Sequence, residues 1–138
     1  MRKILIDTGP IVAFYSGKDE WNEPMTNFLA TFRGQFVTTL AVVSEVMWML
    51  PPNAKVQNEF LSDLSRELYV IEDLVPADFT RIAELNAKYS DLHADFADLS
   101  LIAISERLRV SDILSLDSEF DVYRWGRNNP FKRLRLAK

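Results

Sequence analysis

Short apolar runs of strand length alternate with amphipathic stretches of helix length along this chain, and that alternation most constrains its fold. The spacing of apolar residues predicts strands over residues 3–7, 36–38, 68–71, 112–116 and 131–136. It predicts helices directly after the first strand and over residues 21–32, 40–50, 53–67, 76–89 and 96–108. Strands that alternate with helices favour a parallel sheet with helical connections. We therefore expect an α/β fold, a three-layer α/β/α sandwich around a mainly parallel central sheet.

The length and composition fit one domain over residues 1–138. The chain is 48% hydrophobic and shows no repeat or low-complexity stretch. It has no cysteine, which removes disulfides and thiolate metal sites and suits a reducing compartment. Its first apolar run is shorter than the roughly 7 to 15 residues of a signal-peptide core. No run reaches the roughly 18 apolar residues of a membrane span. We expect a cytoplasmic protein without membrane association.

Four carboxylates interrupt segments that are otherwise apolar. They are Asp7, Glu45, Asp98 and Asp117. Burying an unpaired carboxylate costs several kcal/mol, and acids that converge raise each other's pKa. Because the chain has no cysteine and only one histidine, the most available compensation is a hard divalent cation held by oxygen ligands. The pattern therefore predicts a metal site.

The positions of these acids support the metal site but also allow a simpler interpretation. Asp7 and Asp117 each follow a predicted strand, and sites in open α/β sheets form beyond the carboxyl ends of strands. Both are also suited to a turn or a helix N-cap. Asp95 and Asp98 begin an apolar helix, where their spacing of three places both on one face. Asp95 is suited to cap this helix with Asp98 at its third position, and capping is compatible with metal binding.

Glu45 is harder to explain as a surface residue. Its neighbours on the same helix face cannot form an ion pair with it, since they are Ala41, Val42, Trp48 and Met49. A partner must therefore come from another part of the chain. We favour a role in the site over a position on a solvent-facing helix edge.

Charge is distributed unevenly between the body of the chain and its end. Residues 1–123 hold 10 Lys and Arg against 20 Asp and Glu, whereas residues 124–138 hold six basic residues and no acid. A basic segment of this kind suits contact with phosphate or with an acidic partner. It is equally suited to be a solvated final strand, and the sequence leaves both interpretations open.

Four segments of the sequence together resemble the PIN domain nucleases, in particular the VapC-type toxins of toxin–antitoxin pairs. The segments are residues 4–13, 38–46, 95–103 and 115–120, in the order of the family and over nearly the whole chain. The resemblance rests on the four segments together and on their order. It implies a catalytic, metal-binding acidic quartet with an auxiliary acid and two neighbouring hydroxyl groups. These are Asp7, Glu45, Asp98 and Asp117, then Asp95, then Thr8 and Ser115.

The same resemblance implies an activity, a cofactor and partners. Similar proteins are Mg²⁺- or Mn²⁺-dependent RNA endonucleases that form homodimers. They are held inactive by a cognate antitoxin whose peptide covers the acidic groove. A homodimer also fits the apolar residues that we expect at the surface of the helices around residues 21–32 and 53–64.

Two other functions stay open. A phosphatase or phosphoryl-acceptor domain also places an Asp after the first strand. Such domains usually add a second Asp two residues later or a nearby Lys, and Asp7-Thr8-Gly9 offers neither. The other alternative is a non-catalytic binding module, for RNA or protein, in which the acids only cap helices.

Overall fold

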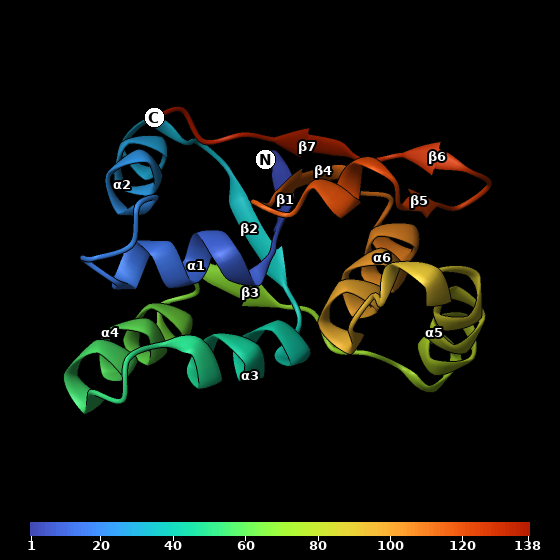
Figure 1. Ribbon diagram of the computed structural model, residues 1–138, viewed down its shortest axis with the longest axis horizontal. Helices are drawn as coiled ribbons and strands as arrows, with labels where there is room; N and C mark the ends of the chain where they lie inside the picture. Colours follow the sequence, from blue (N-terminus) through green and yellow to red (C-terminus); the bar gives the residue numbers. More distant parts are fainter.

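A five-stranded sheet forms the centre of the computed structural model, which describes residues 1–138 (Figure 1). All four strand pairs are parallel, so the sheet is wholly parallel. The spatial order is β3-β2-β1-β4-β7. The strands are β1 (Lys3–Ile6), β2 (Gln35–Thr38), β3 (Tyr69–Ile71), β4 (Asp112–Leu114) and β7 (Lys132–Leu134).

Helices cover the sheet and confirm the predicted α/β/α sandwich. Figure 1 shows α1 and α2 on one side of the central strands and α5 and α6 on the other. The observed helix ends agree with the predicted ends to within about two residues. The helices are α1 (Thr8–Tyr15), α2 (Asn22–Thr31), α3 (Leu40–Met49), α4 (Ala54–Ser65), α5 (Pro76–Lys88) and α6 (Phe96–Leu108), with short 3-10 turns η1 (Ser90–Leu92) and η2 (Ser118–Asp121).

A small hairpin near the end of the chain was not predicted. It pairs β5 (Arg124–Trp125) with β6 (Asn129–Pro130) in antiparallel fashion. Its turn contains Gly126 at φ +57 and Asn128 at φ 72, both in the left-handed region that glycine and asparagine tolerate best. Strands of two residues carry too little periodicity to be recognised from sequence.

The strand order creates a topological switch point between β1 and β4. From β1 the chain moves outward to β2 and β3, and it then returns to the other side of β1 to form β4. The backbone N–H of Asp7, just past β1, donates to the carbonyl of Leu114 at the end of β4 at 3.1 Å. The loops that follow β1 and β4 therefore open at one sheet edge, where parallel α/β proteins form sites.

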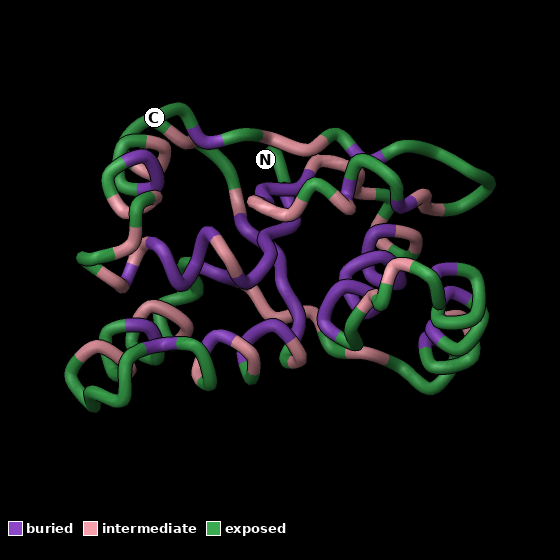
Figure 2. Tube along the Cα trace, viewed as in Figure 1, coloured by how far each residue is buried: buried purple, intermediate pink, exposed green.

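The core lies along the central strands and α6 (Figure 2). Residues 97–105 of α6 are buried on all sides, as its apolar sequence indicates. The expected apolar surface on α2 and α4 is mostly absent, because Met25 and Phe60 are fully buried and Phe28 and Phe32 pack against the core. The most exposed large apolar side chain within a helix is instead Trp48 of α3.

None of the helices combines the length and hydropathy that a membrane crossing requires.

Candidate metal centre

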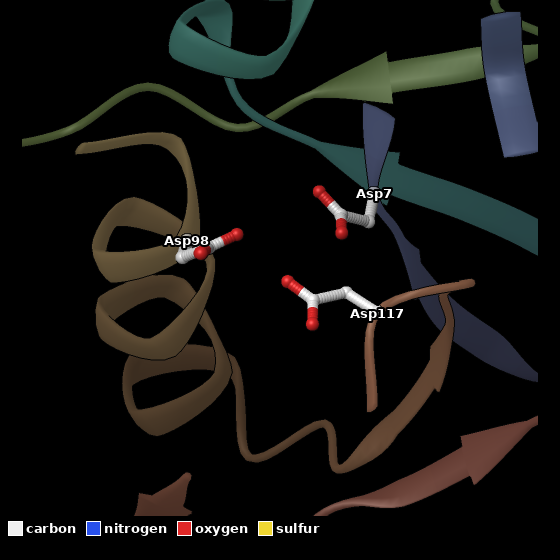
Figure 3. A group of neighbouring side chains, drawn as sticks. All are labelled: Asp7, Asp98 and Asp117. Atoms are coloured by element: carbon white, nitrogen blue, oxygen red, sulfur yellow. The ribbon is translucent and has the colours of Figure 1, made fainter. Parts of the chain in front are cut away.

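Three of the predicted site residues converge at the switch point. One carboxylate oxygen from each of Asp7, Asp98 and Asp117 lies within 4.8 Å of the others. Figure 3 shows the three side chains facing a common space from three elements, namely the end of β1, the first turn of α6 and the loop after β4. Residues far apart in sequence are therefore brought together by the parallel sheet and the helix that packs against it.

Hydrogen bonds fix Asp7 and connect it with Asp117. Asp7 is the N-cap of α1, and its Oδ1 accepts from the backbone N–H of Thr8 at 2.7 Å. Its Oδ2 accepts from the Ser115 hydroxyl at 3.0 Å, and the same hydroxyl accepts from the backbone N–H of Asp117 at 3.0 Å. Asp117 in turn caps η2. The predicted hydroxyl at Ser115 thus holds the first and fourth acids in register.

Asp95 and Asp98 occupy the capping positions that the sequence indicated. Asp95 is the N-cap of α6, and its Oδ1 accepts from the backbone N–H of Asp98 at 2.9 Å. Asp98 is only 8% exposed and belongs to the converging trio, whereas Asp95 is exposed and lies outside it. The same helix turn is capped by Asp95 and brings Asp98 to the other two acids, because the first turn of α6 lies near the end of β1.

Glu45 borders the same hollow without joining the closest group of ligand atoms. The hollow has a volume of about 290 Å³, and its lining includes Glu45, Asp95 and the three converging acids. A buried hydrogen bond of 2.7 Å between the hydroxyls of Thr39 and Ser100 ties the start of α3 to α6. This contact, which the sequence did not indicate, positions the helix that carries Glu45 relative to the helix that carries Asp98.

Burial and mutual repulsion make the charged forms of two of the acids costly. Burial, followed by the charges of Asp117 and Glu45, raises the pKa of the Asp7 carboxyl to about 6, against opposing hydrogen bonds from Thr8 and Ser115. Burial, followed by the charges of Asp7, Asp95 and Asp117, raises the pKa of the Asp98 carboxyl to about 8. At neutral pH the Asp98 carboxyl therefore favours a bound proton, and a nearby cation would favour the ionised forms of both acids.

Glu45 shares this environment. Burial and the charge of Asp95 raise its pKa. The nearby Thr8 hydroxyl opposes that rise. Thr8 Oγ1 is buried and makes no hydrogen bond within the protein.

The donor set fits a hard divalent cation. It consists of three converging carboxylates with a fourth close by, and such oxygen ligands are those that Mg²⁺ and Mn²⁺ prefer. A cation would offset the desolvation and repulsion that raise the carboxyl pKa values. The unsatisfied Thr8 hydroxyl beside these acids fits the same interpretation, because buried polar groups in proteins are normally paired. The residues present can therefore hold the ion that the sequence predicted.

Tyr123 is a buried contact of the centre that sequence reasoning missed. Its hydroxyl lies 3.2 Å from Asp98 Oδ2 and 2.9 Å from Glu119 Oε2, and the residue is fully buried. A phenol has one proton to donate and so satisfies one of these two carboxylates at a time. The aromatic ring looks like ordinary core packing in sequence, and only its polar end shows the connection to the acids.

The sequence matches the PIN domain family over residues 4–126. This chain belongs to the PIN domain family. Its match spans β1, α3, α6 and the loop after β4, so it includes every element that brings an acid to the centre. No curated protein matches the sequence.

Two solved structures share the fold of this PIN domain. VapC20 of Mycobacterium tuberculosis, described as a toxin that cleaves the sarcin–ricin loop, superposes with a TM-score of 0.78 at 15% identity. That match covers 92% of this chain and 99% of VapC20. FitAcB from Neisseria gonorrhoeae has a TM-score of 0.58 at 17% identity, covering 83% of this chain and 88% of FitAcB.

Proposed function

We propose that this single PIN domain, residues 1–138, is a Mg²⁺- or Mn²⁺-dependent endoribonuclease and the toxin of a VapBC-type toxin–antitoxin pair. The observation that carries the proposal is the convergence of three carboxylates at the switch point, two of them with raised pKa values. The fold shared with VapC20, described as a toxin that cleaves the sarcin–ricin loop, supports the choice of substrate. A cytoplasmic location follows from this proposal.

Each acid has a role in the proposed reaction, hydrolysis of an RNA phosphodiester. Asp7, Asp98 and Asp117 would hold one or two divalent ions. A bound ion supplies Lewis-acid stabilisation of phosphate charge and lowers the pKa of water. Glu45, half-buried at the edge of the hollow, orients the attacking water and receives its proton. Ser115 acts by holding Asp7 in place, and Asp95 by holding the first turn of α6.

The direct test is cleavage of end-labelled total RNA by the purified protein with Mn²⁺, Mg²⁺ or EDTA. We expect discrete fragments that require the metal. Asp7→Asn should reduce the rate by about 10³-fold or more, because it removes a buried ligand charge at the reacting phosphate. Asp19→Asn is the matched control, because Asp19 lies outside the acidic hollow. This variant should cleave RNA at the wild-type rate.

Other outcomes separate the proposal from its alternatives. Cleavage by Asp7→Asn at the wild-type rate would remove the assignment. The protein would be a non-catalytic module if it folds and binds RNA without cleaving it, and if Mn²⁺ does not change its thermal stability. Its acids would then serve only as helix caps. Release of phosphate from a small phosphate ester, without RNA cleavage, would indicate a phosphatase.

An apolar groove beside the acids is the proposed docking surface for the antitoxin. It has a volume of about 1070 Å³ and shares Glu45 and Asp95 with the acidic hollow. Its exposed apolar side chains include Trp48, which is 87% exposed, and the stacked rings of Phe79 and Phe96, whose centroids are 6.2 Å apart. A partner segment with apolar anchors and a basic residue directed at the acids would complement this surface.

Trp48→Ala should weaken binding of the cognate antitoxin by about 30-fold or more, because exposed tryptophans of this kind dominate binding energy. Calorimetric titration with the purified antitoxin measures the loss. Leu61→Ala is the control, since Leu61 is 42% exposed on α4 and lies outside the groove. Equal affinities of the two variants would place the antitoxin elsewhere.

Light scattering of the isolated protein tests the proposed homodimer, and a monomeric mass would contradict it.

A further inference from the structure

The structure assigns a second RNA-contacting surface at the pole opposite the acids. We define this distal surface by Lys3, Arg109, Trp125 and Arg127, and propose that it binds the phosphate backbone of the RNA at a distance from the cleaved bond. The inference rests on the proposed nuclease function and adds where the affinity for RNA originates.

The surroundings of the acidic centre supply little attraction for a polyanion. The lining of the acidic hollow includes five acids and no Lys or Arg. The apolar groove beside it is lined by three acids, Glu45, Asp73 and Asp95, and again by no Lys or Arg. Nucleic-acid affinity depends mainly on cationic contacts with phosphate, so most of that affinity must come from another surface.

Many basic residues elsewhere are already engaged with carboxylates. These are Arg2, Arg66, Arg81, Arg107, Arg133, Arg135 and Lys138. The three cations of the distal surface are exposed and form no salt bridge, so they are available to an incoming phosphate. Guanidinium groups suit that ligand because their planar donors match phosphate oxygens.

Two adjoining hollows gather these residues. The first, of about 260 Å³, is lined by Arg109, Trp125, Arg127 and others, and the second, of about 360 Å³, is lined by Arg109 and Lys3 among others. Arg109 belongs to both hollows, so the cations lie on one continuous surface.

The acids on this surface are neutralised. Glu106 lines the first hollow, and Arg81 binds it through two hydrogen bonds of 2.8 and 2.9 Å. Asp112 lines the second hollow and pairs with Arg2 at 3.0 Å. The net positive charge of the distal surface is therefore retained.

The hairpin β5–β6 fixes part of the surface. The N–H of Gly126 donates to Glu106 Oε2 at 2.7 Å, which holds the turn against α6. Arg127, the next residue, thereby lies in the same hollow as Arg109 at the end of α6. The half-buried Trp125 adds an aromatic ring to that hollow, and such rings stack on nucleobases.

The separation of the two poles defines the substrate class. Asp98 and Arg109 lie at opposite ends of α6, so they are separated by roughly 16 Å along a helix that rises 1.5 Å per residue. Because α6 is buried, RNA that contacts both poles must pass over the protein surface and extend at least this far, which is roughly five or more phosphate spacings. Extended or structured RNA reaches both poles, whereas a dinucleotide reaches only the acids.

The test is binding of bulk transfer RNA in EDTA, where no metal assists the acids. We compare two double variants. The arginine pair combines Arg109→Gln and Arg127→Gln. The lysine pair combines Lys18→Gln and Lys55→Gln, and it changes the net charge equally through exposed residues outside the distal surface. The arginine pair should weaken binding by about tenfold and reduce the slope of log affinity against log salt by roughly 1 to 2. Thermal unfolding verifies that both variants fold.

Kinetics give the second readout. With Mn²⁺, the arginine pair should raise KM for long RNA and leave kcat unchanged, and it should not alter cleavage of a dinucleotide. Equal losses in the arginine and lysine variants would overturn the proposal, as would wild-type affinity in both. Loss of self-association without loss of RNA binding would make the surface a protein contact and also overturn it. RNA binding is measured in EDTA and does not depend on cleavage. Failure of the nuclease assay alone would therefore contradict the proposed nuclease function and not the distal surface.

Discussion

Asp98→Asn should stabilise the metal-free protein at pH 8 and at the same time remove most of the stabilisation that Mn²⁺ provides. Asp98 is 8% exposed, and burial beside Asp7, Asp95 and Asp117 raises its pKa to about 8. The folded state therefore binds a proton that the unfolded chain, with an ordinary pKa of 3.8, releases. Stability is lost as pH rises through the window between these two values. A neutral amide avoids that loss.

Thermal unfolding with and without Mn²⁺ measures both effects. We expect the amide to increase the free energy of unfolding of the metal-free protein by about 1 to 3 kcal/mol at pH 8. Asp91→Asn is the matched control, since Asp91 is exposed in η1 and should change neither quantity. A less stable metal-free Asp98→Asn variant would show that burial does not penalise this carboxylate. A variant with the full Mn²⁺ shift would show that the carboxylate is not a metal ligand.

Mn²⁺ affinity should fall by roughly 100-fold between pH 8 and pH 6, because bound protons compete with the ion. The pKa of Asp98 is raised to about 8 and that of Asp7 to about 6, so metal binding must displace one proton just below pH 8 and a second below pH 6. Mn²⁺ affinity falls as the pH is lowered through this range because the two pKa values are raised. Carboxylates of ordinary pKa would show little competition between protons and Mn²⁺ above pH 5.

Calorimetry in two buffers with different ionisation enthalpies tests this competition. Release of about one proton per bound ion is expected at pH 7. The residual Mn²⁺ binding of Asp98→Asn should lack the upper part of the pH dependence, whereas Asp91→Asn should retain all of it. Affinity that does not change between pH 8 and pH 6 would contradict the proton-linked site. At Mn²⁺ concentrations below saturation, the rate of RNA cleavage should show the same pH dependence as Mn²⁺ binding.

Much of the secondary structure could be predicted because its signals are local. Apolar spacing located α3 and α6, and Pro76 at the start of α5 and Pro51-Pro52 after α3 mark helix boundaries. Acids at strand ends also predicted that Asp7 and Asp117 would meet, because parallel strands share a carboxyl edge. The hairpin after Tyr123 was missed, since a turn with two left-handed residues leaves no periodic pattern.

The candidate site divides in the same way. By itself the sequence determined the α/β fold class, the acids that terminate apolar segments and the resemblance to PIN domains. Only the tertiary structure decided that Ser115 bonds to Asp7, that Tyr123 reaches Asp98 and that the exposed apolar surface lies on α3 rather than on α2 and α4. The physical reason is range: helix and strand preferences depend on residues a few positions apart, whereas side-chain partners and burial depend on elements that meet only in the folded chain.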